Sequence, residues 1–201
     1  MKLKRLLAYI IDILIVGFVA SALANIGILN PYLDNYLESY ESFNETLKNI
    51  NEENVMDMFY SAEFVSQYQN TLKYSVYSTG ISLVCYLLYF VGFQKWNKNQ
   101  TVGKKLMNLK VVNKNKKDDV KVWQYLIRTL IVYNLFFSGL NVCLALCFNT
   151  KLFFTLSLIV SIIGYVITYL GYGMILFRKD GKGLHDLLSG TEVMEVKNVI
   201  N

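Results

Sequence analysis

The chain has 201 residues, of which 54% are hydrophobic and 17% are charged, and its formal net charge is +5. Soluble domains usually carry about 25% charged residues, so this composition argues against a soluble globular protein. The lysines flank long apolar segments, so the positive charge indicates membrane topology, and we expect no nucleic-acid partner.

The first apolar segment covers residues 6–29 and contains one charged residue, Asp12. At about 1.5 Å per residue, a helix of this length crosses a hydrocarbon layer of about 30 Å. A basic tail precedes the segment, and Ala22 to Ala24 resembles a signal-peptide cleavage site. Because Asp12 interrupts the segment and its length suffices to span, we expect a retained transmembrane helix, with cleavage as the alternative.

The connection over residues 30–73 is acidic, with eight Asp or Glu residues against two lysines. Basic residues near span ends favour the cytoplasm, so we expect this segment to be an extracytoplasmic insertion. Its apolar residues between Val55 and Val65 suggest an amphipathic helix that lies on the membrane surface before the second span. A surface that binds a partner is the alternative interpretation.

The second apolar segment, residues 74–94, contains no charged residue and predicts a second transmembrane helix. The connection that follows, residues 95–122, has nine lysines against two aspartates and should lie in the cytoplasm. This connection contains a short motif that begins with Gly103, Lys104 and Lys105. The motif predicts an amphipathic turn of helix followed by an extended apolar end.

Two further uncharged segments, residues 130–149 and 152–177, are joined by a very short turn. The basic C-terminal part should then share the cytoplasmic side with the N-terminus. The expected fold class is an all-α integral membrane protein with four transmembrane helices, arranged as two helical hairpins that each end in a cytoplasmic amphipathic motif.

The two cytoplasmic motifs resemble each other. When residues 103–112 are aligned with residues 184–193, Val112 matches Val193. This similarity suggests a duplicated two-helix unit, and chance similarity over so short a range is the alternative.

Asp12 is the residue in the spans that most needs a partner, since a carboxylate at the bilayer centre costs about 2.5–3.5 kcal/mol. Arg5 lies seven residues earlier on the same helical face and could reach it. Arg128, which precedes the third span at the same expected depth, is the leading candidate for a second cation. Both arginines could instead be ordinary interfacial anchors.

Cys85, Cys143 and Cys147 all lie in apolar segments, and the chain has one histidine. We therefore expect the cysteines to be buried packing residues, with no metal and no cofactor. The chain also lacks the phosphate-binding, dinucleotide, serine-hydrolase and metalloprotease motifs, so we expect it not to be an enzyme.

Three motifs together resemble the RDD family of bacterial membrane proteins. They are Arg5-Leu-Leu-Ala-Tyr-Ile-Ile-Asp12, Gln100-Thr-Val-Gly-Lys-Lys-Leu106 continuing to Val112, and Leu184-His-Asp-Leu-Leu-Ser-Gly-Thr-Glu-Val193. The resemblance implies that the arginine and two aspartates that name the family are Arg5, Asp12 and Asp186. It also implies a single transmembrane domain over residues 1–194, followed by a tail at 195–201. Met194 is a mild departure from the hydrophobic end that the family usually shows, and the acidic insertion lies outside the family pattern.

Two functions remain open. In the first, the protein transports ions or small solutes, for which the resemblance implies sodium/proton exchange in some relatives. Asp12 would bind the sodium ion or proton, Asp186 and His185 would relay at the cytoplasmic mouth, and four helices would require a homo-oligomer. In the second, the protein is a non-transporting scaffold in the cell membrane, Arg5, Asp12 and Asp186 form a structural clasp, and the outer connection binds a membrane partner.

Overall fold

The computed structural model describes residues 1–49, 55–115 and 119–196. The chain is mostly helical, and it divides into two compact units. The first unit contains residues 1–20, 83–136 and 164 onward, and the second contains residues 21–82 and 137–163. Every residue predicted to form the polar cluster lies in the first unit.

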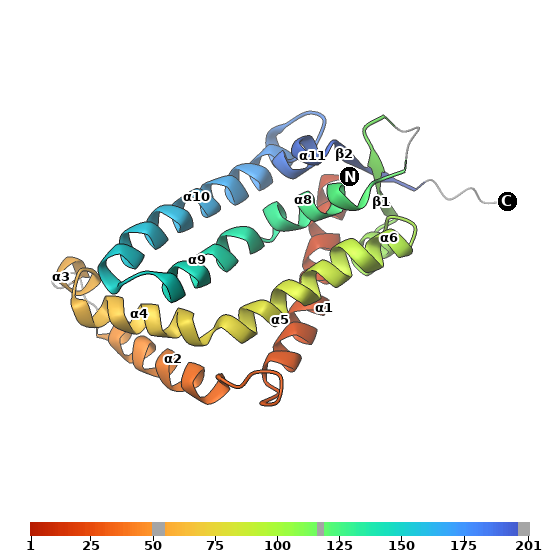
Figure 1. Ribbon diagram of the computed structural model, residues 1–201. Coiled ribbons are helices and arrows are strands. Elements are labelled where there is room, and N and C mark those ends of the chain that lie inside the picture. The colour runs from red at the N-terminus through yellow and green to blue at the C-terminus, as the bar shows by residue number, and fades with distance from the viewer. Residues whose placement is uncertain (50–54, 116–118, 197–201) are drawn as a thin grey trace. The chain divides into compact units, whose positions relative to one another are not determined.

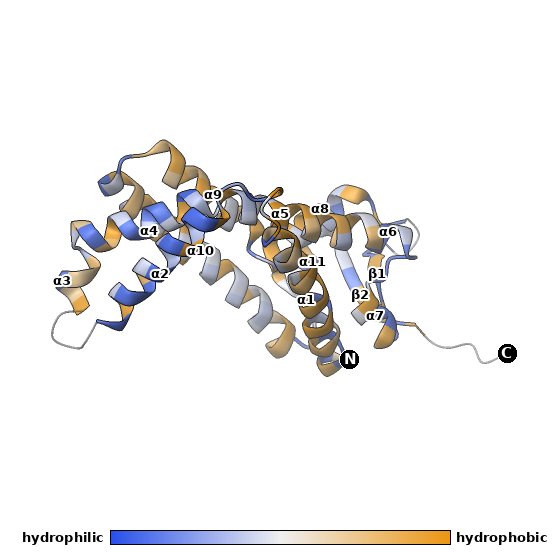
Figure 2. Ribbon diagram, turned by 90° about the horizontal axis from the view of Figure 1, so that it is seen from below, coloured by the Kyte–Doolittle hydropathy of each residue, from blue (hydrophilic) through white to orange (hydrophobic). Residues whose placement is uncertain are grey.

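Three helical stretches are long and apolar enough to cross a membrane: α1 (Lys2–Ala24), Val76–Trp96, and α10 (Thr150–Phe177). The second of these consists of α5 (Val76–Leu87), the π-helical segment η1 (Leu88–Phe93) and α6 (Gln94–Trp96). Figure 2 shows α1 as mostly apolar. Many large apolar side chains on these helices are exposed, as lipid-facing helices require.

The third apolar segment is interrupted, although one uninterrupted helix was predicted over residues 130–149. It consists of α8 (Val122–Val132) and α9 (Leu135–Cys147), with a bend between them. Asn134 lies at the bend with a φ of +56°, a left-handed conformation that asparagine adopts more readily than most residues. The described residues therefore contain three candidate spans, or four if α8 and α9 together form one.

The expected boundaries shift at the other spans as well. Helix α1 ends at Ala24, before the turns at residues 25–30, whereas the prediction extended it to residue 29. The predicted start of the second span at residue 74 coincides with the end of a separate helix, because Ser75 separates α4 from α5.

The second unit contains α2 (Leu33–Lys48), α3 (Val55–Phe59) and α4 (Ala62–Tyr74). The Ser61 side chain caps α4 by accepting from the N–H of Phe64 at 3.1 Å. Phe64 and Val65 belong to a buried cluster with Ala145 and Phe153. The prediction of a helix lying on the membrane surface is therefore wrong for Phe64 and Val65, which pack inside the protein.

The first unit contains the two motifs that the sequence predicted to be cytoplasmic, each a short helix followed by a strand. Helix α7 (Val102–Leu106) precedes β1 (Leu109–Asn113), and α11 (Leu184–Ser189) precedes β2 (Thr191–Glu195). The strands pair antiparallel and lie side by side in Figure 1. The sequence predicted the extended ends but not their pairing into a sheet.

The register places Val111 opposite Val193, and both side chains are buried in a core with Leu109 and Tyr125. The two strands also bury the same positions, the first and the third. Val111 is therefore the counterpart of Val193, and the predicted match with Val112 is wrong by one residue. A shift by one residue turns every side chain of a strand to its other face.

Candidate functional site

The carboxylate of Asp186 is the centre of a buried ion-pair cluster. One Oδ accepts from Arg5 Nη2 at 2.7 Å and from the backbone N–H of Gly183 at 2.9 Å, and the other accepts from Arg128. Arg128 also donates to the Thr191 hydroxyl at 2.5 Å. The side chain of Asp186 has no exposed surface, so two cations from two separate helices, α1 and α8, meet at one buried acid.

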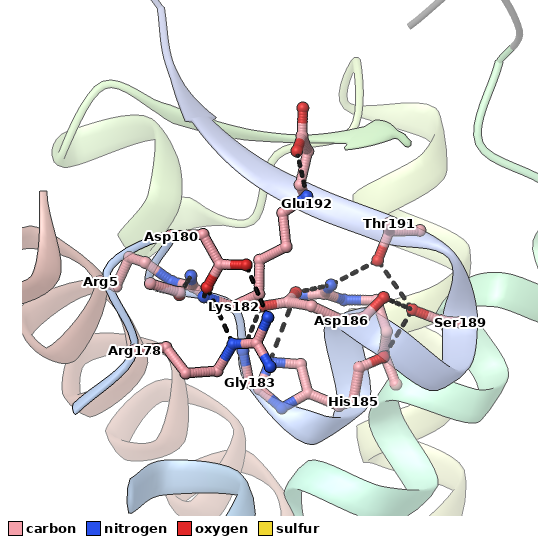
Figure 3. Close-up of polar contacts among 12 residues, drawn as sticks. Arg5, Arg178, Asp180, Lys182, Gly183, His185, Asp186, Ser189, Thr191 and Glu192 are labelled. Atoms are coloured by element: carbon pink, nitrogen blue, oxygen red, sulfur yellow. Dashed lines mark hydrogen bonds and ion pairs between the residues drawn. The ribbon is translucent and has the colours of Figure 1, made fainter. Parts of the chain in front are cut away.

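Further contacts hold the loop around this cluster. Arg5 donates to the carbonyl of Gly181, where the backbone has a φ of +63° that glycine tolerates. Figure 3 shows the Ser189 hydroxyl between His185 and Thr191, 2.6 Å from the His185 carbonyl and 2.7 Å from the Thr191 hydroxyl. The C-terminal motif therefore presents a fixed set of polar groups to α1 and α8.

The carboxylate of Asp12 is the centre of a second cluster and is 1% exposed. Its Oδ1 accepts from the Tyr89 hydroxyl and from the backbone N–H of Gly103, both at 2.8 Å. Its Oδ2 accepts from the Thr101 hydroxyl at 2.5 Å and lies 3.8 Å from Lys104 Nζ. Asp12 thus joins α1 to the beginning of α7.

Gly103 is required by the close approach of α7 to α1. A Cβ at this position would overlap the carbonyl oxygen of Ala8 and would lie 2.9 Å from Asp12 Oδ1. A side chain therefore cannot be added without moving the backbone of one of the two helices. The next lysine in the motif, Lys105, is exposed.

The predicted pairing of Asp12 with Arg5 or Arg128 is wrong. Both arginines instead contact Asp186, and Lys104 is the cation beside Asp12. A spacing of seven residues places Arg5 and Asp12 on one face of α1, but the long Arg5 side chain extends to the C-terminal motif. Sequence spacing within one helix cannot show which loop covers that face.

Several contributing residues were not predicted. Tyr89, Thr101 and Thr191 supply hydroxyl groups to the two clusters, and Gln124 donates to the carbonyl of Ser189 at 2.7 Å. Thr101 could have been found, since a threonine immediately before a short helix is a strong N-cap signal. It caps α7 by accepting from the N–H of Lys104 at 3.3 Å.

Burial determines the electrostatics of the charged groups in α7 and α11. It lowers the pKa of Lys104 to about 8, an effect that Asp12 opposes and that Arg128 and Arg5 enhance. It lowers the pKa of His185 to about 3, so this side chain is neutral at pH 7, whereas an ordinary histidine titrates near that pH. Burial would raise the pKa of Asp186, but Arg128, His185 and Arg5 together hold it below its ordinary value.

A cavity of about 270 Å³ lies beside the two clusters. Its cationic lining consists of Lys2, Arg5, Lys104 and Arg128. The remaining wall is mainly aromatic and aliphatic and includes Tyr9, Tyr133, Tyr172, Ile175 and Leu176. Among the described residues, no aspartate or glutamate lines the cavity.

No group of three His, Cys, Asp or Glu side chains in the described residues is placed to hold a metal ion. The three cysteines are free, and Cys143 and Cys147 are exposed. The expectation that these two residues pack in the interior is therefore wrong.

The geometry can be set beside known proteins. The RDD family profile matches residues 2–190, a range that contains Arg5, Asp12 and Asp186. The chain belongs to the RDD family. Its membership, together with the long apolar helices, identifies a membrane protein. No curated protein and no solved structure matches this RDD chain. The single-domain assignment over residues 1–194 stays a prediction.

Proposed function

We propose that this RDD protein is a non-transporting membrane scaffold in which two buried carboxylates fasten the first helix to two cytoplasmic motifs. The observation that carries the proposal is that each carboxylate already accepts three hydrogen bonds within the protein. Asp186 accepts from two arginines and a backbone N–H, and Asp12 accepts from two hydroxyls and a backbone N–H. We call this arrangement, Arg5, Asp12, Lys104, Arg128 and Asp186, the clasp.

A buried carboxylate that is surrounded by hydrogen-bond donors is suited to structure rather than to ion exchange. Sodium and other hard cations need several oxygen ligands, whereas the groups nearest to Asp12 direct N–H and O–H donors at it. The cavity lining also carries like charge, which repels a cation in a medium of low dielectric constant. Removing one member of such a buried pair leaves an uncompensated charge and costs about 3–5 kcal/mol.

Cation/proton exchange is the second candidate function, and Lys104 favours it. Its Nζ lies 3.8 Å from Asp12 Oδ2, and its pKa of about 8 allows the proton to leave near physiological pH. A sodium ion could then take the place of the ammonium group beside Asp12. This mechanism differs from the one that the sequence suggested, because Lys104 would release the proton, whereas the sequence suggested Asp12 as the proton-binding group and Asp186 and His185 as the relay.

The proposal includes a topology for the protein in the cell membrane. α8 and α9 count as one span, which gives four spans with both termini and the 95–122 connection in the cytoplasm. The basic character of these segments and the acidic character of residues 30–73 support this orientation. The acidic outer segment is the surface we assign to a membrane partner or a second copy of the chain. Cysteine labelling that found residues 95–115 outside the cell would contradict the orientation.

Flux measurements test the scaffold against the exchanger. Purified protein in liposomes is exposed to proton and sodium gradients, alongside Asp12→Asn and the control Asp180→Asn, an exposed acid outside the clasp. The scaffold predicts no flux in any variant and a lowered melting temperature for Asp12→Asn alone. Flux that is present in the wild type and lost in a folded Asp12→Asn variant would establish the exchanger instead.

A further inference from the structure

The lining of the cavity beside the clasp carries more positive charge than the two carboxylates of the clasp neutralise. Lys2, Arg5, Lys104 and Arg128 line it. Asp12 and Asp186 lie behind this lining, and each is 1% exposed. Two carboxylates thus face four cations, which leaves two positive charges in excess at the cavity wall. Like charges at close range in a protein interior repel strongly, so an anion inside the cavity would be stabilised.

Lys2 and Lys104 are the cations with the weakest partners. Lys2 Nζ donates to the carbonyl oxygen of Leu176 at 2.5 Å, a neutral acceptor at the end of α10. Lys104 Nζ lies 3.8 Å from Asp12, beyond direct hydrogen-bond distance. Both ammonium groups can therefore donate to a ligand without breaking a short ion pair.

The rim of the cavity is apolar and lies on two spanning helices. Leu6 of α1 is 50% exposed, Leu176 of α10 is 57% exposed, and both line the cavity. Exposed apolar side chains on spanning helices face lipid. Tyr9 and Tyr172 add aromatic side chains of the kind that sit at the level of lipid headgroups. A ligand with a charged head and an apolar tail would match this lining.

The volume limits which part of such a ligand enters. A water molecule occupies about 30 Å³ in the liquid, so the cavity holds about nine groups of that size. That is room for a phosphate and a glycerol unit but not for acyl chains, which would have to remain in the bilayer.

We propose that this cavity binds the phosphate headgroup of an anionic phospholipid from the cytoplasmic leaflet, with the acyl chains leaving between α1 and α10 past Leu6 and Leu176. The cytoplasmic leaflet carries anionic lipids, and basic pockets between spanning helices on that side bind such headgroups. The proposal goes beyond the scaffold function and rests only on the cytoplasmic placement of the motifs.

Variants at the rim test the proposal without disturbing the clasp. Leu6→Glu places a carboxylate at the cavity, and Leu3→Glu is the matched control, since Leu3 is 68% exposed on the same helix and does not line the cavity. Lys2→Gln removes a lining cation, and Lys4→Gln is its control, because Lys4 pairs with Glu195 at the surface.

The measurement is native mass spectrometry of the full chain, mixed with equal amounts of phosphatidylglycerol and phosphatidylcholine. We expect the wild type to retain phosphatidylglycerol preferentially. One charge near a membrane surface corresponds to about a fivefold change in binding, so Lys2→Gln should weaken retention by about that factor and Leu6→Glu by more. Both controls should bind as the wild type does.

Three outcomes would overturn the proposal. The first is equal retention of both lipids by the wild type, and the second is equal loss in a variant and its control. The third is a thermal stabilisation by soluble glycerol phosphate as large as that by phosphatidylglycerol, which would identify a free anion instead of a lipid. None of these depends on ion flux, so failure here and failure of the scaffold proposal are distinguishable.

Discussion

The backbone N–H of Gly103 lies 2.8 Å from Asp12 Oδ1, so one carboxylate in α1 fixes the position of α7. The contact requires α7 to approach α1 more closely than a side chain permits, because a Cβ at Gly103 would overlap the Ala8 carbonyl oxygen. The glycine and the aspartate therefore act as one structural unit.

Replacing Gly103 with alanine should separate the two helices. We expect Gly103→Ala to lower the free energy of unfolding by about 1–3 kcal/mol, as overpacking of a buried site does, and to weaken the Asp12 hydrogen bond as well. Thermal unfolding in detergent measures the loss. Gly92→Ala is the control, since a Cβ there would meet nothing within 4 Å. Equal melting temperatures for both variants would contradict the close approach.

Removing the negative charge of Asp186 should leave Arg5 and Arg128 buried without a counterion. We expect Asp186→Asn to lower the free energy of unfolding by about 3–5 kcal/mol. Asp180→Asn, which affects an exposed pair with Arg178, should leave the melting temperature nearly unchanged.

A double-mutant cycle isolates the ion pair itself. Arg5→Gln in the Asp186→Asn background should cost less than Arg5→Gln alone, because the partner is already lost. Additive losses in the cycle would show that the contact between Arg5 and Asp186 contributes nothing to stability.

The pH dependence of stability should depend on His185, the one histidine in the chain. Its pKa falls from an ordinary value of 6.5 to about 3 in the folded protein, mainly through burial. The group facing it most closely is Asp186, at 3.5 Å, with Arg128, Arg5 and Lys104 nearby. The folded state holds His185 in its neutral form. The contribution of His185 to stability is therefore fully present above pH 6.5 and declines as the pH falls below that value.

Between pH 6.5 and about pH 5, the decline should amount to about 2 kcal/mol. The pKa of Asp186 is lowered in the folded protein, so the contribution of this carboxylate to stability is fully present above its ordinary pKa of 3.8. Asp186 therefore does not titrate between pH 6.5 and about pH 5. Melting temperatures measured across that window should fall in the wild type and stay flat in His185→Gln. The same slope in both proteins would assign the pH dependence to another group.

The sequence predicted the membrane class and the location of the apolar segments because block length and charge asymmetry are local properties of the chain. It also predicted that Asp12 needs a partner, since burying a charge in a span is costly at any position. The interruption at Asn134 was missed because asparagine inside an apolar run is compatible with a continuous helix, and only the left-handed φ shows the break.

The partners within the clasp depend on tertiary structure. Arg5 is on the same face of α1 as Asp12, yet it contacts Asp186, which is 181 residues distant in the chain. Lys104 reaches Asp12 only because the Gly103 backbone approaches α1 closely. Spacing along one helix defines a face, whereas the choice of partner follows from loops whose position the sequence pattern does not encode.

The pairing of Val111 with Val193 gives a direct test of how β1 and β2 are joined. Lys114 donates to Gly190, and Val196 donates to Asn108, at opposite ends of the two-stranded sheet. Antiparallel pairs alternate between hydrogen-bonded and non-hydrogen-bonded positions, so the Val111–Val193 pair falls at a non-hydrogen-bonded position, where side chains are closest.

Cysteines at these two positions should therefore form a disulfide across the sheet. In a background with Cys85, Cys143 and Cys147 replaced by serine, mild oxidation of Val111→Cys/Val193→Cys should produce a crosslink that shifts mobility on a gel and reverses with reductant. Val112→Cys/Val193→Cys is the matched control, because residue 112 pairs with Glu192 and its side chain lies on the other face. Crosslinking of the control in preference to the first pair would show that the strands pair one residue out of this register.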